Sequence, residues 1–476
     1  MAKLTGFLEY DRLDPAKRAI ESRIRDFNEI EGMLAEETIL QQASRCMDCG
    51  IPSCHSFGCP LVNRIPDWND RVFRNDWRCA LDLLHQTNNF PEITGRICPA
   101  PCEAACTLSI NQKPVTIRHI ELQIAERGWR EGFIKPQPPD WKTGKRVAVI
   151  GSGPAGLAAA QQLCRMGHEV VVYEKSERIG GLLRFGIPDF KLEKWVLDRR
   201  LDQLMKEGVR FETRVDVGLD LSAHFLRRSF QAVLIAAGCT VPRDLGIQGR
   251  DLGGIHFAMD FLAAQNRIAS GIDDAPARSI DASGEPVLVI GGGDTGSDCV
   301  GTSIRQGAES VTQIEILPCP PKVRSDHNPW PEWPDTLRTS TSQEEGCSRE
   351  WGVLTRSFEG KKGRVTAALC IRVEWIRDKK SGERVFKEIP GSEFEIRAGL
   401  VLLAAGFLHV EHGPLVKSLG LDLTRSGHIL IDGSFMTNVA GVFAAGDCVL
   451  GSSLVVKAIR QGRLAADGIH RYLLSS

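Results

Sequence analysis

One stretch sets the architecture of most of this chain: Lys145-Arg146-Val147-Ala148-Val149-Ile150-Gly151-Ser152-Gly153-Pro154-Ala155-Gly156. Its short β-branched run predicts a buried parallel strand, and its glycines predict a tight turn into the helical pattern from Ala155 to Met166. Residues Glu169 to Tyr173 then read as a second strand. The resulting βαβ unit predicts a Rossmann-like α/β domain with a dinucleotide site.

The residues of this turn have separate physical roles. Gly151 permits the turn, Gly153 lets the backbone approach a pyrophosphate, and Gly156 allows close packing of helix on strand. Pro154-Ala155 begins the helix, whose free N–H groups favour phosphate. Glu174 follows Gly151 by 23 residues, where a carboxylate can accept hydrogen bonds from ribose hydroxyls. A plain glycine turn is the alternative, but strand, helix and acid together favour a dinucleotide.

Two later segments favour FAD as this dinucleotide. Gly180-Gly181-Leu182-Leu183 follows Glu174 closely. Gly441-Val442-Phe443-Ala444-Ala445-Gly446-Asp447 resembles the second FAD signature of flavoproteins related to the pyridine nucleotide–disulfide reductases. That resemblance implies that Asp447 meets the ribityl chain, whereas the alternative is a buried strand ending in a Gly-Asp turn. The predicted FAD-binding residues are Gly151, Gly153, Pro154, Ala155, Gly156, Glu174, Gly181, Leu182, Gly446 and Asp447.

A second βαβ unit begins about 140 residues after the first. Val287 to Ile290 reads as a strand, Thr295 to Gln306 as a helix and Ser310 to Leu317 as another strand. A second nucleotide site beside an FAD site predicts a nicotinamide donor, NAD(P)H. Its predicted residues are Gly291, Gly293, Asp294, Thr295, Gly296 and Glu315.

The choice between NADH and NADPH stays open at this point. Glu315 follows Gly291 by 24 residues and favours NADH, because a carboxylate there bonds the ribose 2′-OH and repels a 2′-phosphate. Lys322 and Arg324 would favour NADPH if they folded back onto that phosphate. The paired sites predict hydride transfer from nicotinamide to flavin, which requires no side-chain nucleophile, so we predict no catalytic residue. No Cys-x-x-Cys pair lies near the flavin segment, which disfavours disulfide reductase chemistry.

Seven of the 15 cysteines are closely spaced, and they predict metal ligation rather than disulfides in a reducing compartment. Thiolates at such spacings can wrap an iron–sulfur cubane, and two Cys-Pro dipeptides add to the similarity with ferredoxin-like loops. Structural zinc is the alternative, although four thiolates would satisfy it. Cys79 lies in a helical pattern and is expected in the core. The predicted thiolate ligands are Cys46, Cys49, Cys54, Cys59, Cys98, Cys102 and Cys106.

Long motifs in this region and beyond resemble the small (beta) subunits of glutamate synthase. They are Cys46-Met47-Asp48-Cys49-Gly50-Ile51-Pro52, Ile65-Pro66-Asp67-Trp68-Asn69, Asn88-Asn89-Phe90-Pro91-Glu92, Gly95-Arg96-Ile97-Cys98-Pro99-Ala100-Pro101-Cys102-Glu103 and Asn328-Pro329-Trp330-Pro331. The resemblance covers nearly the whole chain, and the same module forms the N-terminal part of dihydropyrimidine dehydrogenase.

The resemblance implies two [4Fe–4S] clusters with crossed ligation. One set would be Cys46, Cys49, Cys54 and Cys106, and the other Cys59, Cys98, Cys102 and Glu121. In dihydropyrimidine dehydrogenase a glutamine takes the last of these places. The gap from Cys54 to Cys59 is one residue longer than the expected pattern, and the gap from Cys98 to Cys102 is two shorter than in many relatives. A solvated helix charge is the alternative for Glu121.

The resemblance also implies a partner. The large (alpha) subunit of glutamate synthase carries FMN and an amidotransferase site and forms L-glutamate from L-glutamine and 2-oxoglutarate. This chain would then be the electron-input subunit. The same module serving another partner, as in ferredoxin:NADP oxidoreductase-type or sulfide dehydrogenase-type complexes, is one alternative. A zinc-stabilised scaffold with degenerate nucleotide sites is another.

Composition excludes several other classes of protein. The formal net charge of −1 gives no reason to expect nucleic acid as a partner. No apolar run approaches the roughly 18 residues that span a bilayer, and the charged start of the chain predicts no signal peptide. We therefore expect a cytoplasmic protein without a membrane partner.

The predicted fold is two Rossmann-like dinucleotide-binding domains preceded by a mainly α-helical iron–sulfur domain. Helical patterns in the first domain cover Ala16 to Arg25, Ile30 to Ser44, Asp76 to Thr87 and Val115 to Arg127, and prolines at 135–140 suit an extended linker. The predicted domains are residues 1–140 for the clusters, 145–240 with 401–476 for FAD, and 241–400 for NAD(P)H.

Overall fold

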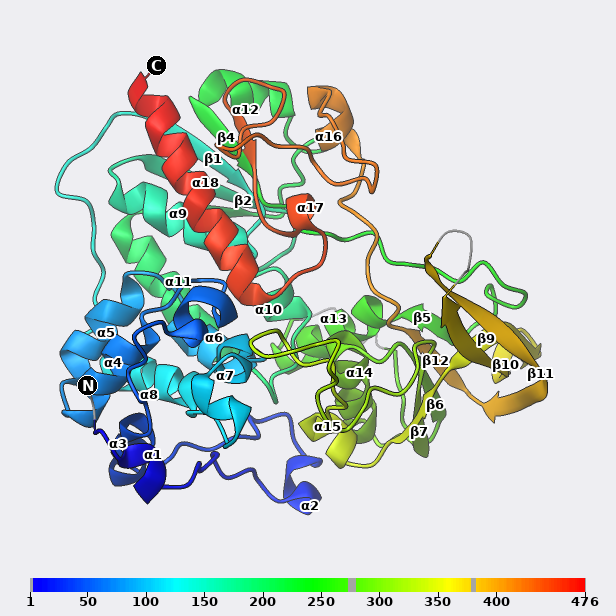
Figure 1. Ribbon diagram of the computed structural model, residues 1–476. Coiled ribbons are helices and arrows are strands. Elements are labelled where there is room, and N and C mark those ends of the chain that lie inside the picture. Colours follow the sequence, from blue (N-terminus) through cyan, green and yellow to red (C-terminus); the bar gives the residue numbers. More distant parts are fainter. Residues whose placement is uncertain (1–2, 273–279, 378–381, 476) are drawn as a thin grey trace.

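The computed structural model describes residues 3–272, 280–377 and 382–475 of the chain (Figure 1). It contains a helical N-terminal domain and two α/β domains, each built on a five-stranded parallel sheet. A three-stranded antiparallel sheet is attached to the second α/β domain. The fold class predicted from the sequence is confirmed.

The N-terminal domain packs short helices around the closely spaced cysteines. Its elements are α1 (Gly6–Glu9), α2 (Ile20–Arg23), α3 (Glu36–Ser44), η1 (Cys54–Gly58), α4 (Ile65–Phe73), α5 (Trp77–His85), α6 (Pro91–Ile97), α7 (Pro101–Ala104), η2 (Thr107–Ile110) and α8 (Ile117–Arg130). The helices predicted over Ala16–Arg25 and Ile30–Ser44 are shorter than expected. Residues 11–34, which we call the N-terminal strap, are mostly extended because their polar side chains bond to distant parts of the chain.

The first α/β domain follows a linker that has neither helix nor strand. Its elements are β1 (Arg146–Ile150), α9 (Pro154–Arg165), β2 (Glu169–Glu174), α10 (Leu182–Phe185), α11 (Lys194–Glu207), β3 (Arg210–Thr213), α12 (Ala223–Ser229), β4 (Ala232–Ile235), α16 (Pro414–Leu419), β13 (Val442–Ala444), α17 (Asp447–Leu450) and α18 (Val455–Ser475). All strand pairs are parallel, in the order β13-β4-β1-β2-β3.

The second α/β domain repeats this arrangement. Its elements are β5 (Ile255–Phe257), α13 (Ala258–Ala269), β6 (Pro286–Ile290), α14 (Asp294–Arg305), β7 (Ser310–Glu315), α15 (Thr341–Glu344), β8 (Ser348–Trp351) and β12 (Leu400–Leu403). The parallel order β5-β12-β6-β7-β8 matches the first sheet position by position. The predicted boundary before residue 401 needs correction, because β12 hydrogen-bonds to β5 and β6 and so belongs to the second sheet.

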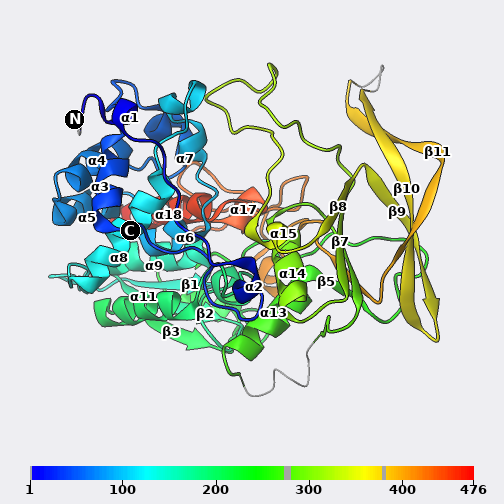
Figure 2. The ribbon, with the colours of Figure 1, turned by 90° about the horizontal axis from the view of Figure 1, so that it is seen from below.

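The antiparallel sheet was not foreseen from the sequence. It consists of β9 (Val353–Lys361), β10 (Arg364–Arg377) and β11 (Arg384–Arg397), in the order β11-β10-β9. Apolar residues of β9 and β10 pack against the second parallel sheet in one core cluster. The sheet lies on the side of the molecule away from the cysteines (Figure 2).

Buried contacts join the three domains. The helical domain and the helices α9, α11 and α18 of the first α/β domain share one continuous core. Arg200 on α11 forms a two-pronged ion pair with Glu92 on α6, at 2.7 Å for both bonds. The strap reaches the second α/β domain, where Arg23 and Arg305 donate to the buried carboxylate of Glu345 at 2.7 and 2.6 Å. No helix among the described residues is both long and apolar enough to cross a membrane.

Candidate functional site: two nucleotide turns and two thiol groups

The turn after β1 has the tight geometry that its glycines allow. Gly151 has a φ of +100°, and a Cβ there would lie 2.4 Å from the carbonyl oxygen of Ala236. A Cβ on Gly156 would lie 2.0 Å from the carbonyl oxygen of Gly151, so α9 packs directly on the turn. A Cβ on Gly153 would meet nothing within 4 Å. The backbone around Gly153 is therefore open at the N-terminus of α9, which suits a pyrophosphate.

Acidic residues lie close to this turn. Glu174 ends β2 and accepts hydrogen bonds from the backbone N–H and hydroxyl of Ser152, at 3.1 and 2.5 Å. The same hydroxyl accepts from the N–H of Gly180 at 2.9 Å, which ties the segment before Gly181 to the turn. Asp447 begins α17 and accepts from Ser453 at 2.7 Å. Burial raises the pKa of Asp447 above its usual value.

The turn after β6 has the same geometry. Gly291 has a φ of +127°, and a Cβ there would lie 2.3 Å from the carbonyl oxygen of Ala404, which directly follows the neighbouring strand β12. A Cβ on Gly296 would lie 2.2 Å from the carbonyl oxygen of Gly291, whereas Gly293 again faces open space. A pocket lies beside Thr295, at the ends of β5 and β12. The second turn can therefore present its N–H groups and an adjacent pocket to one ligand.

Glu315 ends β7 as predicted, and its carboxylate is held in place. It accepts from the N–H of Gly292 at 2.7 Å and from the N–H of Leu317 at 3.1 Å. Arg324 donates to the carbonyl oxygens of residues 328, 329 and 332, at 2.8 to 3.2 Å, so its guanidinium closes its own loop. Neither Arg324 nor Lys322 forms a hydrogen bond or an ion pair with Glu315 or Gly292.

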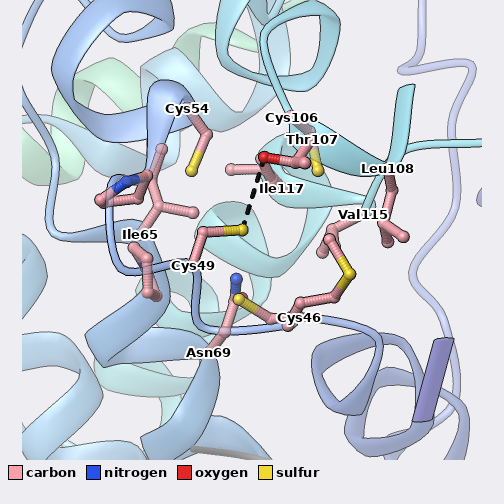
Figure 3. A pocket seen from close by; sticks show the side chains of 13 residues that line it. Cys46, Cys49, Cys54, Ile65, Asn69, Cys106, Thr107, Leu108, Val115 and Ile117 are labelled. Atoms are coloured by element: carbon pink, nitrogen blue, oxygen red, sulfur yellow. Dashed lines mark hydrogen bonds between the residues drawn. The ribbon is translucent and has the colours of Figure 1, made fainter. Parts of the chain in front are cut away.

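Four of the predicted ligands line one cavity in the N-terminal domain. They are Cys46, Cys49, Cys54 and Cys106 (Figure 3). Cys106 reaches the other three from the far end of the cysteine region, because Gly58 lets η1 pack against α7. A Cβ on Gly58 would lie 2.7 Å from Cys102 Cα. No group of three or more His, Cys, Asp or Glu side chains in the described parts of the chain is arranged to hold one metal ion.

The remaining predicted ligands form a second group. Cys59, Cys98 and Cys102 interact electrostatically with one another and with Glu121. Glu121 is buried on α8 and accepts from Asn88 Nδ2 at 3.1 Å and from the Thr94 hydroxyl. Burial raises its pKa to about 7. Its side chain therefore faces the thiols rather than solvent.

Backbone N–H groups are directed at the thiols by unusual backbone conformations. Asp48, Val62 and Ala100 all have positive φ, at 50°, 53° and 60°. Their N–H groups lie against the sulfurs of Cys46, Cys59 and Cys98 respectively. Non-glycine residues in this region of conformational space are strained, and such strain concentrates at functional sites. The three strained residues supply donors to sulfur, which favours thiolate.

Burial opposes ionisation of the free thiols. It raises the pKa of Cys46 to about 11 and the pKa values of Cys59 and Cys98 to about 12. Thiols that bind no metal would therefore keep their protons here at physiological pH. The N–H donors become useful once a bound metal removes the thiol protons. The donor set thus fits a thiolate-ligated centre better than it fits seven free thiols, five of them buried.

Three residues near the first cavity were not identified as functional from the sequence. Thr107 accepts from Cys49 Sγ at 3.4 Å, and the Asn69 side chain lines the same cavity. Trp330, on the loop between β7 and α15, donates its indole N–H to the carbonyl oxygen of Cys106 at 3.3 Å. Asn69 and Trp330 stand in motifs that had been quoted only for their family resemblance. Their contacts depend on tertiary packing that local sequence patterns do not reveal.

Comparison with protein families gives two matches. Residues 23–133 match the family described as dihydropyrimidine dehydrogenase domain II, 4Fe–4S cluster. Residues 145–462 match the pyridine nucleotide-disulphide oxidoreductase family. The solved structure of FprA, a Mycobacterium tuberculosis oxidoreductase, aligns with a TM-score of 0.57 at 20% identity, over 70% of this chain and 85% of that chain. This last likeness concerns the fold.

Curated relatives extend the match to the full length. The glutamate synthase [NADPH] small chain of Mycobacterium tuberculosis is 51% identical over all of this chain and 97% of its own length. The corresponding small chain of Bacillus subtilis is 43% identical over 100% and 99%. The glutamate synthase [NADH] of Schizosaccharomyces pombe is 46% identical over 98% of this chain, which corresponds to 22% of that longer protein.

Proposed function

Because the chain is an oxidoreductase of the glutamate synthase small-chain family, we propose that it is the electron-input subunit of a glutamate synthase. It oxidises NAD(P)H at FAD and passes the electrons through two [4Fe–4S] clusters to a large chain. The large chain forms L-glutamate from L-glutamine and 2-oxoglutarate. The observation that carries this proposal is the presence in one chain of two thiol groups and two glycine turns of matching geometry.

Each proposed cofactor site uses a different set of residues. The first turn, with Glu174 and Asp447, binds FAD, and the second turn, with Glu315, binds the nicotinamide nucleotide. When bound, FAD accepts a hydride and the clusters carry single electrons. The chain itself supplies N–H donors for the phosphates and buried, water-poor surroundings for the thiolates. No side chain is required as nucleophile.

Two clusters are favoured over zinc by the arrangement of the thiols. A zinc ion draws four thiolates to within about 2.3 Å of itself. Among the described residues, Cys46, Cys49, Cys54 and Cys106 line one cavity without being arranged to hold a single metal ion, whereas a cubane places an iron opposite each thiolate. The second set is Cys59, Cys98, Cys102 and Glu121. The distribution of these ligands over two groups supports one cluster in each.

NADH is the preferred donor in this proposal. The carboxylate of Glu315 is fixed by the N–H groups of Gly292 and Leu317 at the end of β7. A fixed carboxylate there accepts from a ribose 2′-OH and repels a 2′-phosphate. Arg324, the nearest candidate for a phosphate contact, is engaged by three carbonyl oxygens. The names of the relatives include both NADH and NADPH enzymes.

Exposed apolar side chains around the first thiol cavity form the proposed exit surface toward the large chain. Ile51, Phe57 and Ile110 are 85%, 57% and 59% exposed, and each lies within four residues of a thiol that lines the cavity. A patch of this kind suits a protein partner. In the Schizosaccharomyces pombe relative, the region matching this chain is covalently joined to the rest of the enzyme. The alternative is the same module serving another partner, which copurification of a large chain would distinguish.

All 15 cysteines are free thiols in the structure, which supports a reducing, cytoplasmic setting.

The test is to measure iron, sulfide, zinc and flavin in anaerobically purified protein and to titrate its visible spectrum with NADH and NADPH. We expect about eight irons and one FAD, as two cubanes and one flavin require, and bleaching by the nucleotide. Zinc without iron, or absence of flavin, would contradict the proposal.

A further inference from the structure

Asn69 is a buried amide whose side chain makes no hydrogen bond of normal geometry within the described residues. It lies on α4 in the motif Ile65-Pro66-Asp67-Trp68-Asn69 and lines the cavity of Cys46, Cys49, Cys54 and Cys106. Its relative exposure is 0%, and neither its Oδ1 nor its Nδ2 makes a hydrogen bond of normal geometry. Figure 3 shows its nitrogen directed into the cavity beside Cys46 Sγ. Burial raises the pKa of Cys46, and the interaction with the Asn69 side chain opposes this rise.

Other buried asparagines do not share this property. Asn63, Asn88, Asn89 and Asn266 are also buried, and each makes at least one side-chain hydrogen bond. Asn88 is the closest comparison, because it lies beside the second thiol group and donates to Glu121 and Thr94. An unsatisfied buried amide is costly, so natural proteins rarely retain one without a ligand that completes it.

We propose that Asn69 Nδ2–H donates to the iron–sulfur cluster of the first thiol group and raises its reduction potential above that of the second. This inference rests on the proposed function. Reduction adds one negative charge to a cluster, and a hydrogen-bond donor stabilises that charge. The second group has no equivalent donor, because the nearby Asn88 amide already donates to Thr94 and Glu121. Electrons therefore flow from the second cluster to the first, which lies beneath Ile51, Phe57 and Ile110.

The test uses full-length, cluster-loaded protein and a redox titration followed by electron paramagnetic resonance. Asn69→Leu removes the donor at similar volume, and Asn69→Ala removes it with less steric demand if the first variant folds poorly. We expect the ratio of reduced to oxidised first cluster at a fixed potential to fall at least tenfold, equal to about 59 mV for one electron. The potential of the second cluster should stay unchanged.

Trp68→Phe is the matched control. Trp68 is the neighbouring residue on the same helix, is fully buried and also has an N–H without a partner, but it does not line the cavity. Unchanged potentials in the Asn69 variants with full iron content would overturn this inference and leave the proposed function standing. An equal shift in Trp68→Phe would overturn it too, since packing alone would then account for the effect. Wild-type protein without iron and sulfide would instead refute the proposed function.

Discussion

Glu121 shows how burial changes the interpretation of one side chain. From the sequence, a cluster ligand and a solvated helix charge were both open. The structure excludes the solvated charge, because Glu121 is only 7% exposed and bonds to Asn88 and Thr94. Burial raises the pKa of this carboxyl group to about 7, so its charged form is unfavourable unless another group stabilises the charge. An iron of the proposed second cluster would do so.

We expect Glu121→Gln to retain both clusters and Glu121→Ala to lose one. The amide keeps an oxygen at the ligand position, whereas alanine leaves that iron without a protein ligand. Iron should fall from about eight to about four per chain in Glu121→Ala, as counted by a chromogenic iron assay. Glu126→Ala, on the same helix but bound to Arg96 and Arg199, is the control. Full iron in Glu121→Ala would rule out the ligand role.

Glu315 is expected to set the nucleotide preference. Glu315→Gln keeps the acceptor for the ribose hydroxyl but removes the charge that repels a 2′-phosphate. The ratio of kcat/KM for NADPH to that for NADH should rise at least tenfold, or about 1.4 kcal/mol. Steady-state assays with an artificial electron acceptor measure both values. An unchanged ratio would show that this carboxylate does not discriminate between the two nucleotides.

Among the elements, the two glycine turns were the most predictable. The sequence determined the order of strand, turn and helix, and the observed α9 (Pro154–Arg165) and α14 (Asp294–Arg305) begin within one residue of the predicted helices. This success has a partly local cause, because Gly156 and Gly296 let each helix pack on its own turn. The cysteine spacings were informative for the same reason.

Two alanine substitutions in the first turn should have different effects. Gly153→Ala places a methyl group in open space, so the fold should persist while FAD affinity falls at least tenfold, or about 1.4 kcal/mol. Gly156→Ala forces a methyl group against the Gly151 carbonyl oxygen, so α9 must move and stability falls as well. Thermal unfolding and flavin fluorescence distinguish the two effects. Equal loss of stability in both variants would contradict this interpretation.

Elements that depend on distant contacts were harder to predict. Residues 401–476 were predicted to belong to the FAD-binding domain, but β12 within them pairs with β5 and β6 of the second sheet. A helix was predicted over Ala16–Arg25, but only Ile20–Arg23 is helical, and Arg23 bonds to Glu345, 322 residues away. Long alternating strands such as β10 and β11 were missed because residues on β11 are largely exposed and give little apolar periodicity.

For the whole molecule, the apolar patch gives a prediction about assembly. Ile51→Glu combined with Phe57→Glu should weaken association with a large chain at least tenfold, because charges would be buried at the interface. Iron content and nucleotide-driven bleaching should stay unchanged, since both side chains are exposed. Leu219→Glu is the control, because Leu219 is 70% exposed on the first α/β domain. Size-exclusion chromatography of the mixed chains measures the outcome.

The way the site combines distant segments could not be read from the sequence. Local patterns indicated both nucleotide turns and the thiols, but not that Asn69 faces the thiol cavity or that Trp330 reaches Cys106. Crossed ligation was available only from the family resemblance. The structure supports one of the two ligand sets directly, because Cys106 lines one cavity together with Cys46, Cys49 and Cys54.

The strap has a consequence for biosynthesis. Arg23 leaves the ribosome 322 residues before Glu345, its buried partner. At about 5–20 residues per second, this separation corresponds to roughly 16–64 seconds of translation. All seven predicted thiolate ligands have been synthesised once Cys106 is added, while the strap lacks its anchor in the second α/β domain until Glu345 follows. We therefore expect an interval in which iron can be delivered to the nascent N-terminal domain before the finished chain closes over it.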